Sequence, residues 1–108
     1  MVNEMPDSDK RKILEYLGKC YRRGKMIMDV SNFSSRTAEN SALYNANLNY
    51  VYLIDRALSE CSANTRNIIR HDYLTNSDPD WYKEYYSESM FYRYKKSAVS
   101  EFLEKLNI

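Results

Sequence analysis

The sequence predicts an all-α protein, and three observations support this fold class. The 108 residues include only two glycines and two prolines, which leaves few places for tight turns. No segment shows the sustained alternation of apolar and polar residues that is typical of a half-buried strand. Apolar residues instead recur at steps of three and four, the period of one face of an α-helix. At this length we expect one compact domain with a small core.

The first long helix is expected to begin at Asp7 or Ser8, either of which can cap it, and to continue to about Asp29. Its apolar stripe comprises Ile13, Leu17, Cys20, Gly24 and Ile27. Gly18 and Gly24 each weaken a helix by about 1 kcal/mol relative to alanine. We therefore interpret these glycines as points of close packing against another helix, or as a kink.

This helix also carries the most basic stretch of the chain. Residues 10–25 include seven Lys or Arg residues and a single acid, Glu15. One interpretation is an ordinary solvated outer face, and the other is a contact with phosphates or with an acidic partner. Under the second interpretation, the candidate partner-binding residues are Lys19, Arg22 and Arg23.

A second long helix is expected from about Thr37 to Cys61, after a polar loop at Ser31 to Arg36. Its apolar residues approach a heptad spacing and comprise Leu43, Tyr50, Ile54, Ala57 and Cys61. Two such helices are predicted to pack as an antiparallel hairpin within one chain, with a helical homodimer as the alternative. Residues 1–61 would then form an N-terminal hairpin that serves for dimerisation or partner binding.

Residues 62–108 are expected to form a unit of three helices. The first spans residues 65–73, and the last and longest ends near Leu106. A short helix is expected between them, with Asp78 as its cap and Pro79 at its first position, where a missing N–H costs nothing, followed by the segment at residues 81–86. The whole chain would be one compact domain, in which the N-terminal long helices pack against this C-terminal trihelical part.

The C-terminal unit is rich in aromatic side chains, namely Trp81, Tyr82, Tyr85, Tyr86, Phe91, Tyr92 and Tyr94. We expect most of them to fill the core, because a unit this small needs large side chains. The alternative is a stacking platform for single-stranded nucleic acid. Tyr82 and Tyr92 are expected to be the most exposed of the set.

The last helix is predicted to have two different faces. Ser87 or Ser89 can cap it, and its apolar stripe comprises Phe91, Tyr94, Ala98, Phe102 and Leu106. Arg93, Lys95 and Lys96 lie on the other side, near its beginning. A capped basic helix that follows a short helix and a tight turn is how a helix-turn-helix presents its recognition helix to DNA.

The basic residues of this helix suit different contacts with duplex DNA. Arginine can fork to guanine O6 and N7, so Arg93 is the candidate base reader, whereas Lys95 and Lys96 are candidate phosphate contacts. Arg66 and Arg70, one turn apart on the preceding helix, are candidates for holding the flanking backbone. The alternative interpretation is ordinary solubilising charge on a helix surface.

Several function classes find little support in the sequence. The net charge of +1 supplies no general attraction to nucleic acid, so any binding must come from the local distribution of charge. Cys20 and Cys61 lack CxxC spacing and are expected to be buried thiols in a reducing cytoplasm. His71 is the single histidine, and no glycine-rich phosphate loop or metal-ligand spacing is present. We therefore expect no enzyme, no metal or other cofactor, and no membrane span.

The C-terminal residues resemble a known family. The run from Thr65 to Leu74, followed by the run from Ser89 to Val99 and by Phe102 and Leu106, resembles the region-4-like end of sigma factors, and most closely the ArpU-type phage transcriptional regulators. In that family the matching helix enters the major groove of DNA. The resemblance implies double-stranded DNA as the partner and implies groove contacts at Ser89, Tyr92, Arg93 and Lys96.

Two hypotheses about function follow. The first is a transcription-associated regulator that binds DNA through its C-terminal helix-turn-helix. The second is a helical interaction module that binds RNA polymerase or another transcription component without reading DNA, through the basic patch of the first helix or the heptad-like face at residues 43–58. The turn before the last helix differs from the family pattern, because Lys83 to Ser87 contains no glycine.

Overall fold

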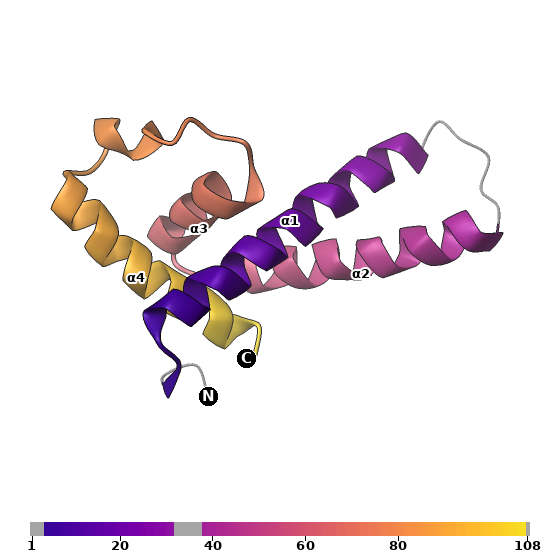
Figure 1. The fold of residues 1–108 in the computed structure, drawn as a ribbon, viewed down its shortest axis with the longest axis horizontal. Coiled ribbons are helices and arrows are strands. Elements are labelled where there is room, and N and C mark those ends of the chain that lie inside the picture. The colour runs from indigo at the N-terminus through magenta and orange to yellow at the C-terminus, as the bar shows by residue number, and fades with distance from the viewer. Residues whose placement is uncertain (1–3, 32–37, 108) are drawn as a thin grey trace.

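A computed structural model of the chain describes residues 4–31 and 38–107, and in these ranges it confirms the all-α prediction (Figure 1). The helices are α1 (Asp7–Ser31), α2 (Ala38–Ser59), α3 (Ala63–Ile69) and α4 (Glu88–Lys105). A π-helical turn, η2 (Arg70–Leu74), continues α3, and a 3-10 turn, η3 (Trp81–Glu84), precedes α4. The described residues contain no strand.

The helices are arranged as a hairpin that meets a smaller pair (Figure 1). α1 and α2 pack along each other in antiparallel directions, as predicted, and the far end of their hairpin projects away from the rest of the chain. α3 packs on α4 at the other end, and the first half of α1 crosses the second half of α4. The projecting hairpin explains the elongated shape, which measures 49 × 33 × 22 Å.

The predicted cap is confirmed for the last helix but not for the first. α1 already includes Asp7, whose carboxylate faces Lys96 and Lys10, and the backbone N–H groups of Asp9 and Lys10 both donate to the Pro6 carbonyl. The Ser87 hydroxyl caps α4 by accepting from the Met90 N–H at 3.3 Å. α1 continues through Ser31, so that residue does not belong to the predicted loop, and residues 32–36 of that loop lie outside the described ranges.

The predicted start of the short helix is wrong. Asp78 does not cap a helix that opens at Pro79, because its carboxylate accepts from the Asp80 N–H at 2.9 Å and closes a local turn instead. The helical turn begins only at Trp81, and it is a 3-10 turn of four residues that ends at Glu84. What precedes α4 is therefore shorter and tighter than the α-helix expected at residues 81–86.

One hydrophobic core takes side chains from all four helices. Its largest fully buried members are Leu14, Ile54, Leu58, Ile68, Ile69, Phe102 and Leu103. The predicted inner face of the last helix is confirmed at Phe91, Ala98 and Phe102, whereas Tyr94 is 37% exposed. On α2, Tyr50 is 43% exposed and not part of the core, and the side chain of Leu43 lies outside the described set.

The aromatic residues before α4 pack against Phe91 in its first turn, and one of them is buried where we expected it to be exposed. Tyr82, expected to be exposed, is buried and stacks on Phe91 with ring centroids 3.9 Å apart. The physical reason is the tighter rotation of a 3-10 turn, about 120° per residue, which aims Tyr82 at α4 and leaves Tyr85 69% exposed. Tyr92 is 56% exposed, as expected.

A carboxylate on α4 fastens the beginning of α3. Glu101 accepts from the Ser62 backbone N–H at 2.7 Å and from the Thr65 hydroxyl at 2.5 Å. Burial raises the pKa of Glu101, but the hydrogen bonds from Thr65 and Ser62 lower it more, so the pKa lies below its ordinary value of 4.5. The ionised form is thus the one that the fold stabilises.

Glu101→Gln is expected to lower the free energy of unfolding at pH 7 by about 1 kcal/mol, because it removes the charge from hydrogen bonds that remain partly solvated. A depressed carboxyl pKa contributes stability that is complete above the ordinary value of 4.5 and is lost as the pH falls through the lowered pKa. The difference between the variant and the natural protein should therefore shrink below pH 4.5 in urea titrations. Glu104→Gln, an exposed change one turn later on α4, is the control and should change the free energy of unfolding at pH 7 by no more than about 0.5 kcal/mol.

Candidate nucleic-acid interface

The first half of α4 presents one open polar face. Ser89, Tyr92, Arg93 and Lys96 are spaced by three, one and three residues, which places all four on the same side of an α-helix. All four are exposed, Tyr92 by 56% and the side chain of Lys96 by 69%. α1 meets α4 further along, where the Lys10 ammonium donates to the Ser100 hydroxyl at 3.0 Å. α1 also reaches the edge of the face, where Asp7 lies 3.2 Å from the Lys96 ammonium, but all four side chains remain exposed.

Lys95 does not share this face, which corrects its predicted role as a free phosphate contact. Its ammonium lies 2.8 Å from a carboxylate oxygen of Asp72 and 5.2 Å from the centre of the Tyr73 ring. Burial lowers the pKa of Lys95, but the hydrogen bond to Asp72 and the surrounding charges outweigh this, so the pKa is raised overall. The same carboxylate accepts from the Trp81 indole N–H at 2.7 Å. Lys95 thus ties α4 to η2 and η3.

The two arginines predicted to flank the recognition helix are placed differently. The Arg66 guanidinium donates to the Cys61 carbonyl at 2.7 Å and so stabilises the corner between α2 and α3. Arg70 is exposed at the start of η2. It lines a groove with α1, on the side of Tyr21 and Leu74, and does not join the open face of α4. Neither residue therefore extends that face directly.

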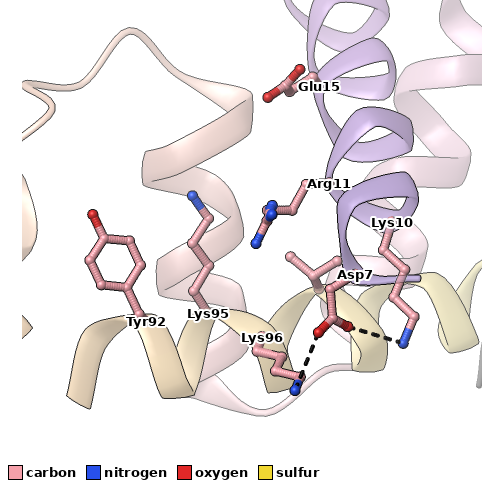
Figure 2. Close-up of a pocket in the computed structure, with 8 residues that line it drawn as sticks. Asp7, Lys10, Arg11, Glu15, Tyr92, Lys95 and Lys96 are labelled. Atoms are coloured by element: carbon pink, nitrogen blue, oxygen red, sulfur yellow. Dashed lines mark ion pairs between the residues drawn. The ribbon is translucent and has the colours of Figure 1, made fainter. Parts of the chain in front are cut away.

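A groove of about 350 Å³ lies between the first half of α1 and the middle of α4, beside the open face (Figure 2). Its lining residues are Asp7, Lys10, Arg11, Glu15, Tyr92, Lys95, Lys96 and Val99. Figure 2 shows Arg11 reaching from α1 toward α4, with Glu15 above it and Lys95 opposite. Asp7 lies 3.2 Å from the Lys96 ammonium and 3.8 Å from the Lys10 ammonium. The groove is rich in cations, and the Asp7 carboxylate is shared between Lys10 and Lys96.

Arg11 is the residue that sequence reasoning did not place at this site. It belongs to the basic stretch of residues 10–25, but nothing in the sequence indicates that the start of α1 crosses α4. Among the described residues Arg11 forms no ion pair, so its charge is available at the rim of the open face. Only tertiary packing brings it beside Tyr92 and Lys96.

The three predicted partner-binding residues separate into two groups. Lys19 and Arg23 are exposed, and with Lys12 they form a stripe along the outer side of α1. Arg22 turns inward and donates to the backbone carbonyl of Tyr73. The stripe formed by Lys12, Lys19 and Arg23 makes no ion pair with other described residues.

The other reactive side chains occupy structural positions. His71 stacks on Trp81 with ring centroids 4.3 Å apart, and its Nδ1 atom lies 3.0 Å from the Ser77 hydroxyl. Burial raises the pKa of the Cys61 thiol to about 11, so it is protonated at neutral pH, and Cys20 is half-buried. In the part of the chain that the structure describes, no cluster of His, Cys, Asp and Glu could hold a metal ion. Nor does that part contain a helix long and apolar enough to cross a bilayer.

The arrangement at the start of α4 therefore offers hydroxyl, guanidinium and ammonium donors on one exposed helix face. Such donors suit the edges of bases and the oxygens of phosphates. The resemblance to sigma factor region 4 remains a prediction that rests on the C-terminal residues. No protein-family model, curated protein or solved structure matches the chain.

Proposed function

We propose that the protein binds double-stranded DNA through the open face of α4 and acts as a transcription-associated regulator. The observation that carries the proposal is the placement of Ser89, Tyr92, Arg93 and Lys96 on one helix face, where all four side chains are exposed. The major groove admits one α-helix, and the side chains near the start of that helix reach the base edges. Arg93 is the base reader in this proposal, and Lys96 is a phosphate contact.

Arg11 adds a phosphate contact from α1. It lies at the groove beside Lys96 and Tyr92, so a backbone phosphate next to the recognition helix would meet two cations from different elements. Asp7 pairs with Lys96 at 3.2 Å in the free protein, and a phosphate would have to displace that carboxylate. Because the overall charge is only +1, these local contacts must supply most of the electrostatic attraction.

The test compares a base reader with a phosphate contact. After selection of a preferred site from random duplexes, Arg93→Ala is expected to lower discrimination between that site and unrelated DNA by about 1–3 kcal/mol. Lys96→Ala should weaken all duplexes alike and lower the slope of log affinity against log salt by about one unit. Fluorescence anisotropy across a salt series measures both effects.

Lys105→Ala is the matched control for this test, because it removes one exposed charge from the far end of the same helix. It should change neither discrimination nor the salt slope. Binding to no duplex at low ionic strength, or binding that does not respond to salt, would remove the proposed function.

One observation favours a second function, a helical module that binds an acidic region of RNA polymerase or of another transcription component. The outer stripe of α1, formed by Lys12, Lys19 and Arg23, is exposed and unpaired among the described residues. None of these three residues lines the groove beside the open face of α4, so the stripe is a separate surface. Failure of duplex binding would leave this as the better-supported function.

A further inference from the structure

A second cationic groove lies between the later half of α1 and η2. It has a volume of about 440 Å³, and its lining residues are Tyr21, Arg22, Lys25, Met26, Asp29, Arg70, Leu74, Thr75 and Asn76. The chain that leaves α3 passes beside the middle of α1 (Figure 1). Its residues 70 and 74–76 form one wall of the groove. None of the four residues on the open face of α4 belongs to this groove.

Three cations from two elements converge on this groove, and one acid lines it. Arg22 and Lys25 come from α1, Arg70 comes from η2, and the acid is Asp29. Burial, together with a hydrogen bond to Asp55, raises the pKa of Tyr21 to about 12, so this hydroxyl adds no negative charge at neutral pH. The groove therefore carries an excess of positive charge.

Two of these cations are held in place by contacts other than carboxylates. The Arg22 guanidinium donates to the Tyr73 carbonyl, and the Lys25 ammonium lies 5.9 Å from the centre of the Tyr21 ring. Within the described ranges, neither Lys25 nor Arg70 forms an ion pair. Side chains that are positioned but not neutralised lose little entropy when they bind an anion.

The opposite wall offers neutral polar groups. Thr75 and Asn76 line it, and the Thr75 hydroxyl donates to the Arg70 carbonyl at 3.0 Å. That hydrogen bond fixes the corner where η2 ends, next to the Arg70 side chain. The Asn76 side chain is exposed at the groove and carries an amide that can donate to an oxygen.

We infer that this groove binds a phosphoryl group, with Lys25 and Arg70 as its charged ligands and Arg22 as a third cation in the lining. A phosphoryl group offers several acceptor oxygens and up to two negative charges, which matches a set of three cations better than a single carboxylate does. The volume lies within the range of small-molecule sites, about 300–1,000 Å³, so it also holds part of the molecule that carries the phosphate. The source is either a free phosphorylated compound or a backbone phosphate of bound DNA.

Inorganic pyrophosphate is the probe for the test, titrated into the full-length protein and followed by amide chemical shifts in NMR spectra. We expect saturable binding with shifts centred on residues 70–76 and on the later half of α1. Lys25→Ala and Arg70→Ala should each weaken binding about tenfold, the size expected for loss of a charged hydrogen bond. Lys19→Ala removes the same charge from the outer side of α1 and should change the affinity less than twofold.

The Lys19→Ala control also defines the result that would contradict the inference. Non-saturable shifts, or equal weakening by Lys19→Ala and Lys25→Ala, would show that pyrophosphate responds only to net charge and would overturn it. Arg93→Ala should leave pyrophosphate binding unchanged. Pyrophosphate binding therefore tests this groove separately from the proposed DNA binding. If Arg70→Ala also weakens duplex binding and lowers its salt slope, the phosphate belongs to DNA, and if duplex binding is unaffected, the site takes a free phosphorylated compound.

Discussion

Asp72→Ala is expected to lower the free energy of unfolding by about 2–4 kcal/mol, the largest effect that we expect from a single polar side chain. Asp72 accepts from the Lys95 ammonium at 2.8 Å and from the Trp81 indole at 2.7 Å. The Asp72 and Lys95 side chains are only 14% and 23% exposed, so the substitution leaves a largely buried charge without its partner. Breaking a fully buried pair costs about 3–5 kcal/mol, and the remaining exposure reduces this somewhat.

A double-mutant cycle separates the ion pair from the rest of the site. Lys95→Met keeps the length of the side chain and removes its charge, so Asp72→Ala combined with Lys95→Met should recover at least half of the lost stability. Urea titrations of the two single variants and the double variant measure the coupling. If the double variant is as unstable as the sum of the two single changes, the pair does not hold α4 to η2 and η3.

The same network explains how far the candidate site could be predicted. Helical spacing alone places Ser89, Tyr92, Arg93 and Lys96 on one face, because side-chain direction along a helix is fixed locally. Lys95 belongs to the same basic run, and its different role depends on Asp72, which is 23 positions earlier in the chain. A partner at that separation has no local signal, so the sequence could not distinguish Lys95 from its neighbours.

The fold shows the same division between local and distant causes. The start of α4 after Ser87 follows from a capping hydroxyl, and both long helices follow from apolar periodicity, signals that act within one or two turns. The π-helical turn at residues 70–74 and the burial of Tyr82 depend on packing against α1 and α4, so propensity could not predict them. Arg11 reaches the candidate site for the same reason, because the crossing of α1 over α4 is a tertiary event.

The π-helical turn also explains why a glycine stands in the middle of α1. A Cβ atom on Gly18 would clash with the backbone carbonyl oxygen of Tyr73 and would lie 3.1 Å from its carbon and 3.2 Å from the Arg22 guanidinium. The Tyr73 carbonyl is the acceptor for Arg22, so the close approach and the hydrogen bond belong to one contact between α1 and η2. Gly18 is therefore a point of close packing, one of the two roles that its position predicted.

Gly18→Ala is expected to lower the free energy of unfolding by about 2 kcal/mol, although alanine favours the helix. The gain in helix propensity is about 1 kcal/mol, but the new methyl group meets backbone that can move only if η2 shifts and the Arg22 contact breaks. Thermal and urea unfolding measure the change, and Lys19→Ala, at the next and exposed position, should stay within about 0.5 kcal/mol of the natural protein. A Gly18→Ala variant that is more stable by about 1 kcal/mol would mean that propensity alone governs the position, and α1 and η2 would then not be in contact there.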